Sequence, residues 1–237
     1  MKFKALVSSE SNKKYESKVQ SRTIQDLPEG DVLIKVYFSS LNYKDALSAI
    51  GNKGVSRNYP HTPGIDAAGI IETSESKNFK VGEEVIVTGY DLGMNTSGGF
   101  SEYIRVPSEW VVKKPEGISL SESMALGTAG LTAGLCVRKL INHKLTPDSG
   151  KLFVTGATGG VGIVAMMLLS KLGFEVVAIT GKLDSQDMLK EYGASEVITR
   201  EDLDQPLISP LQKSIYAGGI DAVGGNVLSN LICATSQ

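Results

Sequence analysis

Residues 151–162 read Lys-Leu-Phe-Val-Thr-Gly-Ala-Thr-Gly-Gly-Val-Gly, a short apolar run that breaks into glycines, and an apolar segment resumes at residues 163–172. This pattern predicts a strand, a tight turn and a helix. Glycines lack a Cβ atom, so they permit a sharp turn and let a ligand approach the main chain. The N–H groups and the dipole at the start of the helix favour an anion, usually a dinucleotide pyrophosphate.

A second strand-like run at residues 175–179 follows the helix and completes a βαβ unit of the expected length. Because of this context, we expect a dinucleotide site at the turn rather than an ordinary glycine-rich connection. The residues of the turn expected to bind the cofactor are Thr158, Gly159, Gly160 and Val161.

The composition is that of an ordinary core-forming chain. Of its 237 residues 41% are hydrophobic and 21% are charged, the net charge is −2, and the length predicts two domains. The sequence has no stripe of basic residues, which argues against a nucleic-acid partner. Cys136 and Cys233 are the only cysteines, so neither a disulfide framework nor a metal-binding cluster is expected. We find no signal-peptide pattern and no apolar run of bilayer length, and we expect a cytoplasmic protein with no membrane contact.

The first half of the chain, residues 1–118, is rich in β-strand signals. Residues 40–50 have helical composition, and their polar side chains, placed just after a strand, are expected to face a cleft. The segment Pro115-Glu-Gly117 marks the expected boundary, which gives domains at residues 1–118 and 119–237. The expected strands of the first domain are residues 4–8, 32–39, 69–73, 84–88 and 101–107.

The second half alternates helix and strand, starting with a helix at residues 119–140. After the glycine turn come strand 175–179, helix 185–192, strand 197–199, a polar link, and strand 219–225. This alternation predicts an α/β fold with a doubly wound parallel sheet. Two-half nucleotide-binding folds commonly have six strands, and this chain stops in the helix after the fourth, so we expect the sheet to lack its C-terminal strands.

The end of the second strand indicates which nicotinamide cofactor is preferred. NAD-specific units usually carry an acidic residue there, whereas a 2′-phosphate calls for cations and hydroxyl groups. This chain has Thr180, Gly181 and Lys182 at that place, and Arg200 follows the third strand. We therefore expect NADP(H), with the nearby Asp184 pointing away from the phosphate. Taken singly, Lys182 or Arg200 is more typical of a solvated surface charge, and only their shared position at strand ends beside the glycine turn favours a cofactor role.

Five stretches together resemble a known family, and they span essentially the whole chain: residues 40–45 (SLNYKD), 63–69 (PGIDAAG), 127–133 (GTAGLTA), 155–162 (TGATGGVG) and 189–194 (LKEYGA). They resemble the medium-chain dehydrogenase/reductase superfamily, and within it the zinc-independent quinone oxidoreductase branch of the YhdH/YhfP type, which includes acryloyl-CoA reductases. The resemblance implies a GroES-like, mostly β catalytic domain followed by a Rossmann domain, with the cofactor in the cleft between them.

The chain departs from the zinc alcohol dehydrogenases where those relatives bind zinc. It has Asn42 in place of a cysteine ligand, and Ile65-Asp66 in place of His-Glu. The first domain also has no cysteines for a structural zinc. We therefore predict no metal, and we interpret Asp45 and Asp66 as structural residues that cap turns around the cleft.

Without a Lewis acid, a simple ketone is poorly activated, and a conjugated acceptor suits hydride transfer better. The expected acceptor is a quinone or an enoyl thioester such as acryloyl-CoA. By resemblance, Tyr43 lies beside the nicotinamide, where it either orients the reactants or donates a proton, while an isolated tyrosine is also common in core or rim packing. Asn42 and Lys44 are weaker catalytic candidates. Thr128 is expected either to line the cofactor or to serve helix packing.

His61 is interpreted as a surface turn residue, and His143 lies in a polar connection. The full-length protein is expected to form a homodimer. The alternative to a reductase is a non-catalytic NADPH-binding protein, or an inactive fragment of such a reductase.

Overall fold

The computed structural model describes residues 1–206 and 212–236, and it divides into two compact units, Met1–Thr128 and Ala129–Gln237. Residues 207–211, in the predicted polar link, lie outside the described residues. The division between the two units falls within helix α2 (Leu120–Asn142), whereas the boundary predicted at residues 118/119 lies just before that helix.

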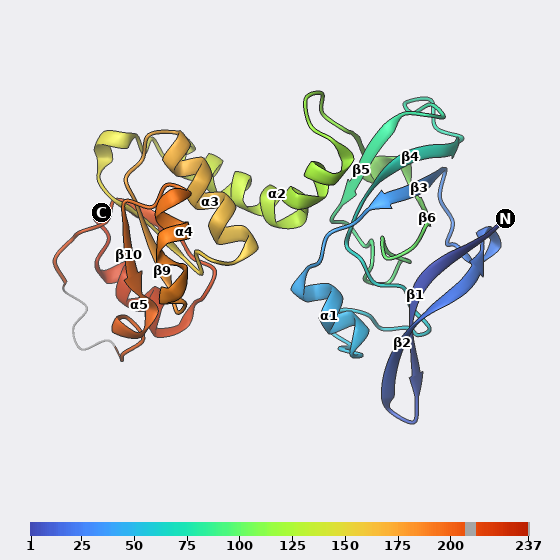
Figure 1. Ribbon diagram of the computed structural model, residues 1–237, viewed down its shortest axis with the longest axis horizontal. Helices are drawn as coiled ribbons and strands as arrows, with labels where there is room; N and C mark the ends of the chain where they lie inside the picture. The colour runs from blue at the N-terminus through green and yellow to red at the C-terminus, as the bar shows by residue number, and fades with distance from the viewer. Residues whose placement is uncertain (207–211, 237) are drawn as a thin grey trace. The chain divides into compact units, whose positions relative to one another are not determined.

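The first unit is built on a five-stranded antiparallel sheet with the order β6-β3-β4-β5-β7 (Figure 1). Its core consists of aliphatic side chains such as Val32, Ile34 and Ile104, which are almost fully buried. The five strands are β3 (Val32–Phe38), β4 (Asp66–Ser74), β5 (Glu84–Thr88), β6 (Tyr103–Val106) and β7 (Val111–Lys113).

A long hairpin formed by β1 (Lys2–Ser11) and β2 (Lys14–Thr23) completes the β structure of this unit. Asn12 and Lys13 connect the strands with φ angles of 51° and 62°, the positive values that a two-residue hairpin turn requires. We did not predict β2, because most of its side chains are polar and exposed, so no apolar alternation marks it. The short strand β7 was also missed.

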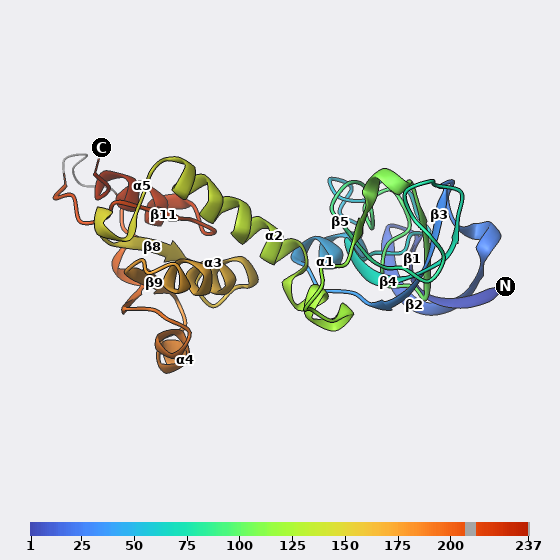
Figure 2. The ribbon, with the colours of Figure 1, turned by 90° about the horizontal axis from the view of Figure 1, so that it is seen from above.

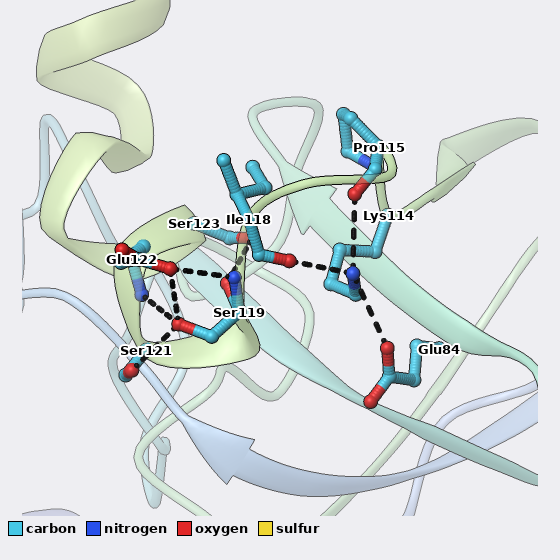
Figure 3. A network of polar contacts seen from close by, with 8 residues as sticks. All are labelled: Glu84, Lys114, Pro115, Ile118, Ser119, Ser121, Glu122 and Ser123. Carbon is cyan, nitrogen blue, oxygen red and sulfur yellow. Dashed lines mark hydrogen bonds and ion pairs between the residues drawn. The ribbon is translucent and has the colours of Figure 1, made fainter.

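A capping box starts helix α2 (Figure 3). The main-chain N–H of Glu122 donates to the Ser119 hydroxyl (3.2 Å), and the Glu122 carboxylate accepts from the main-chain N–H of Ser119 (2.7 Å). Just before it, the Lys114 ammonium donates to the carbonyl oxygen of Ile118 (2.6 Å) and lies 3.3 Å from Glu84 of β5. These contacts fix the path of the chain from the sheet into the helix.

Helix α2 is broken at Gly127, whose φ and ψ angles are 48° and −152°. By length and composition alone, α2 is apolar enough to cross a bilayer, so our expectation that no run reaches that length is wrong. The uninterrupted part, residues 128–142, is about 22 Å long at 1.5 Å per residue, which is shorter than the hydrocarbon core of a bilayer.

The second unit contains a parallel four-stranded sheet with the order β10-β9-β8-β11. Alternate side chains of β8 and β9 point to opposite faces. One set packs with apolar residues of α2, α3 and α4, and the other packs with Val227 and Leu231 of α5, so helices cover both faces of the sheet. Figure 2 shows β8, β9 and β11 of this sheet together with α3 and α5. The elements are β8 (Leu152–Thr155), α3 (Gly160–Lys171), β9 (Val176–Thr180), α4 (Gln186–Glu191), β10 (Glu196–Thr199), β11 (Gly218–Ile220) and α5 (Gly225–Cys233).

The predicted fold class, a mostly β unit followed by a doubly wound parallel sheet, is confirmed. The fourth strand is shorter than expected, because β11 ends at Ile220 and α5 already begins at Gly225. The remaining elements are helix α1 (Tyr43–Ala49) and the short 3-10 helices Ile24–Asp26, Ser108–Trp110, Pro147–Ser149, Leu183–Ser185 and Arg200–Asp202.

Candidate functional site

The glycine turn between β8 and α3 leaves no room for side chains at its closest approach. Gly156 has a φ angle of 58°, and a Cβ atom at Gly162 would lie 2.3 Å from the Gly156 carbonyl oxygen. A Cβ atom at Gly159 would lie 3.1 Å from the same oxygen. The turn therefore brings the main chain of residues 156–162 together, with the first turn of α3 exposed at Gly159 and Gly160. Helix N–H groups at such a start have no partner within the helix.

A pocket of about 260 Å³ lies at the ends of β9 and β10, next to this turn. Five of the residues that the sequence proposed for the cofactor line it together. No carboxylate lines this pocket, and Asp184 is not among its residues. The residues that line it are Gly156, Thr158, Ile179, Thr180, Gly181, Lys182, Arg200 and Val223.

The two threonines and the two cations of this pocket differ in their exposure and in their hydrogen bonds. Thr180 is buried, and its hydroxyl lies 3.4 Å from the Thr158 hydroxyl and accepts from the main-chain N–H of Lys182 (3.0 Å). Lys182 and Arg200 are exposed, and in the described ranges neither forms an ion pair. The Arg200 guanidinium carbon lies 3.6 Å from where a Cβ atom of Gly181 would stand, so it covers the main chain there. The pocket thus combines hydroxyl groups with cations whose charges are available to an anion.

Asp221, just after β11, was not proposed from the sequence. Its carboxylate accepts from the Thr155 hydroxyl (2.6 Å) and from the main-chain N–H of Gly224 (2.9 Å), and the Thr155 hydroxyl accepts in turn from Ala222 N–H (2.9 Å). Thr155 and Asp221 each stand at the carboxyl end of a strand, and the carboxyl ends of neighbouring parallel strands meet at one edge of the sheet. This pair of polar residues could therefore have been found from the sequence.

In the first unit, Asn42 and Thr128 come together on one carboxylate, that of Asp66. The Asn42 amide donates to Asp66 Oδ2 (2.8 Å), the Thr128 hydroxyl donates to Oδ1 (2.7 Å) and Thr128 N–H donates to Oδ2 (3.0 Å). The Ser40 hydroxyl, which the sequence reading passed over, also donates to Oδ2 (2.5 Å). Tyr43 follows directly as the first residue of α1, and its relative solvent exposure is 82%.

The buried Asp45 accepts hydrogen bonds that fix the start of α1. Its carboxylate accepts from the N–H groups of Asn42 (2.8 Å) and Ile65 (2.9 Å), and from Gly64 N–H (3.2 Å). Burial raises the pKa of Asp45, an effect that the hydrogen bonds from Asn42 and Ile65 oppose. Both carboxylates accept from main-chain N–H groups, as expected of residues that cap turns, and their purely structural role stays a prediction.

The interpretation of His61 as a surface residue is wrong. His61 is buried, its main chain forms a bridge with Ser8 of β1, and its Nε2 lies 2.9 Å from the Gly93 carbonyl oxygen. Burial lowers the pKa of His61. No turn is assigned at residues 62–64, and His61 instead pairs with Ser8 of the β1–β2 hairpin, a long-range contact that sequence patterns do not show. His143 is exposed after α2, as expected.

Within residues 1–206 and 212–236, no group of three or more His, Cys, Asp and Glu side chains is arranged to hold a metal ion. At the positions compared with zinc ligands, Asn42 donates to Asp66 and Ile65 is a buried apolar side chain.

The chain is similar to several known proteins. Residues 28–116 match the alcohol dehydrogenase GroES-like domain. The probable acrylyl-CoA reductase AcuI of Escherichia coli is 44% identical over 97% of this chain. The crystal structure of the YhdH oxidoreductase from Salmonella enterica in complex with NADP is 41% identical over 99% of the chain, with a TM-score of 0.94. That of Bacillus subtilis YhfP with NAD bound is 43% identical over 99%, with a TM-score of 0.95.

The chain spans 70% of the length of AcuI and 71% of each of the two solved chains, and 65% of another curated relative. Both units are covered by these matches, including the antiparallel sheet of the first and the parallel sheet of the second. The family predicted from the motifs is therefore confirmed, and this chain belongs to the medium-chain dehydrogenase/reductase superfamily, in the branch of YhdH, YhfP and AcuI.

Proposed function

We propose that this protein is an NADPH-dependent, zinc-independent reductase of activated carbon–carbon double bonds. The observation that carries this proposal is the pocket beside the glycine turn, where Lys182 and Arg200 stand with the hydroxyls of Thr158 and Thr180 and no carboxylate lines the walls. Hydroxyl groups and cations are the partners that a 2′-phosphate requires, whereas a carboxylate would bind the ribose hydroxyl of NAD.

The residues of the second unit would bind the adenosine half of the cofactor. Lys182 and Arg200 would pair with the 2′-phosphate, and Arg200, which already covers Gly181, offers a planar face to the adenine ring. The main-chain N–H groups of Gly159, Gly160 and Val161 would receive the pyrophosphate, because the missing Cβ atoms let it approach the helix start. The turn therefore fits a dinucleotide by its shape and its donors.

The residues of the first unit would serve the reacting end. When bound, NADPH supplies a hydride from its nicotinamide to the β-carbon of a conjugated acceptor, and a proton taken up at the α-carbon completes the reduction. Tyr43 would orient the nicotinamide and the acceptor, and Asn42 and Thr128 would shape the same wall through their bonds to Asp66. An enoyl thioester or a quinone is the substrate class that needs no metal, because its conjugated carbonyl already spreads the developing charge.

The acceptor class is supported by the names of relatives, which include acrylyl-CoA reductases and quinone oxidoreductases. Their activities are those of longer proteins, so the acceptor of this chain is part of the proposal. The expected cytoplasmic location and the homodimer stay predictions.

The test is steady-state oxidation of NADPH and of NADH with acrylyl-CoA, crotonyl-CoA and a benzoquinone, with and without a chelator. We expect turnover with NADPH that the chelator leaves unchanged, and the preferred acceptor then identifies the substrate class. Preference for NADH would contradict the assignment of Thr180, Lys182 and Arg200. NADPH binding without turnover of any acceptor would support the non-catalytic alternative instead.

A further inference from the structure

The carboxylate of Asp66 is the most heavily bonded polar group of the first unit. Asp66 is fully buried at the start of β4, and its two oxygens accept four hydrogen bonds of 2.5 to 3.0 Å. Within the described ranges no ion pair joins it. The donors come from two separate parts of the chain, Ser40 and Asn42 on one side and Thr128, 62 residues away from Asp66, on the other.

The first of these parts is the turn that leads into α1. Asn42 precedes Tyr43, the first residue of the helix, and stands at its N-cap. The carbonyl oxygen of Asp66 also accepts from the Ser39 hydroxyl (2.7 Å), so the main chain and the side chain of Asp66 together hold the turn that ends at Tyr43.

The second part is the break in α2. Gly127 has a φ of 48°, and a Cβ atom there would lie 2.8 Å from Asp66 Oδ2 and 2.5 Å from the Ser40 hydroxyl. The main chain of α2 therefore comes directly against the Asp66 carboxylate, and the bond from Thr128 N–H keeps it there. One buried carboxylate thus ties the turn before Tyr43 to the break in α2.

We propose that Asp66 is a positioning residue, which holds Tyr43 in its productive place by joining the Ser40–Asn42 turn to the α2 break. The proposal rests on the proposed function for the role of Tyr43. The positioning role of Asp66 is supported by the chemistry of the hydrogen bonds that its carboxylate accepts. All four donors face acceptor-only oxygens, three on Oδ2 and one on Oδ1, so the NH₂ group of an asparagine would face either three of them or one. A shift of about 1 Å in a reacting group is enough to cost about 100-fold in rate.

The first experiment needs no turnover. Amide hydrogen exchange is compared between the wild type, Asp66→Asn and the control Asp31→Asn. Asp31 is a partly buried carboxylate of the same unit that accepts from Ser108 N–H, away from the turn. We expect Asp66→Asn to speed exchange about tenfold or more in residues 40–46 and in residues 127–132 together, and Asp31→Asn to change neither. Unchanged exchange in both segments would overturn the proposal, and so would a change in only one.

The second experiment is a double-mutant cycle between Asp66→Asn and Tyr43→Phe, with kcat expressed per NADPH-binding site so that unfolded protein does not count. We expect Asp66→Asn to lower kcat by about 10- to 100-fold with the Kd of NADPH changed by less than about threefold. In that background, Tyr43→Phe should have less than about a twofold further effect, because Tyr43 is already misplaced. Additive effects would overturn the proposal.

The two failures are distinguishable. If the wild type turns over no acceptor, the proposed function fails, while the exchange experiment still decides whether Asp66 couples the two segments. If the wild type turns over and Asp31→Asn lowers kcat as much as Asp66→Asn does, the loss reflects general damage to the unit and the positioning role is wrong.

Discussion

Single side chains at the end of β9 and β10 are expected to set the choice between NADPH and NADH. If Lys182 and Arg200 bind the 2′-phosphate as proposed, removing either charge takes away one charge-assisted contact of about 1.5–3 kcal/mol, or about 10- to 100-fold in Kd. Lys182→Ala and Arg200→Ala should each raise the Kd of NADPH by that factor in titrations followed by nucleotide fluorescence, with NADH affected less than about threefold.

The control for this change is Lys171→Ala, which removes an exposed cation at the last turn of α3, outside the pocket. It should leave both constants unchanged. Equal losses of NADPH and NADH affinity in the Lys182 and Arg200 variants would show that the two cations bind a part of the cofactor common to both.

The buried His61 is expected to make the stability of the first unit depend on pH. Burial lowers its pKa in the folded state below the ordinary value of 6.5, so the unfolded chain binds the proton more readily. The stability that this residue contributes is present above pH 6.5 and is lost as the pH falls below it. Denaturant unfolding at pH 7.5 and pH 5 should show a drop in the free energy of unfolding that is smaller in His61→Gln. The exposed His143→Gln should retain the full drop.

At the scale of elements, the glycines of the β8–α3 turn are expected to be irreplaceable while others are not. A Cβ atom at Gly162 would lie 2.3 Å from a carbonyl oxygen, so Gly162→Ala must move the main chain and should cost several kcal/mol of stability or prevent folding. Gly134, in α2, has no atom within 4 Å of an added Cβ, so Gly134→Ala should stabilise the protein by about 0.5–1 kcal/mol. Thermal unfolding monitored by circular dichroism compares the two, and equal effects would contradict the geometry of the turn.

The start of α2 provides a second prediction at this scale. Ser119→Ala removes the hydroxyl that accepts from Glu122 N–H and leaves that donor without its cap, which should cost about 1 kcal/mol (Figure 3). The neighbouring Ser121 is exposed, and among the residues that the structure describes its hydroxyl bonds only that of Ser119. Ser121→Ala should therefore lose less than half as much in urea unfolding, and an equal loss would show that the cap contributes little.

For the whole molecule, the two units are expected to respond differently to parts of the cofactor. The single tryptophan, Trp110, lies in the first unit and stacks on Tyr90, so its fluorescence reports the unfolding of that unit alone. We expect adenosine 2′,5′-bisphosphate to bind at the pocket of the second unit, because it carries the 2′-phosphate and lacks the nicotinamide. At about 100 times its Kd it should stabilise that unit by about 2.7 kcal/mol, seen by circular dichroism, while leaving the Trp110 transition in place. NADPH should move both transitions. If the bisphosphate raises the Trp110 transition too, the two units unfold as one.

The sequence alone determined the elements whose signals are local. Glycine spacing and alternating apolar runs located β8, α3 and β9, because a tight turn and a buried strand depend on neighbouring residues. The same local signals named Thr158, Thr180, Gly181, Lys182 and Arg200, since the carboxyl ends of adjacent parallel strands must meet. Motif resemblance added the family, which the comparisons confirm.

Only the tertiary structure decided what depends on contacts between distant residues. The polar strand β2 is stabilised by its pairing with β1 and has no apolar face that a pattern would reveal. The buried His61 pairs with Ser8 of that hairpin, and the break of α2 at Gly127 lies against Ser40 and Asp66, where a Cβ atom would not fit. Asp66 gathers donors from residues 40, 42 and 128, and such a meeting follows from the folding of the whole unit, since no local propensity encodes it.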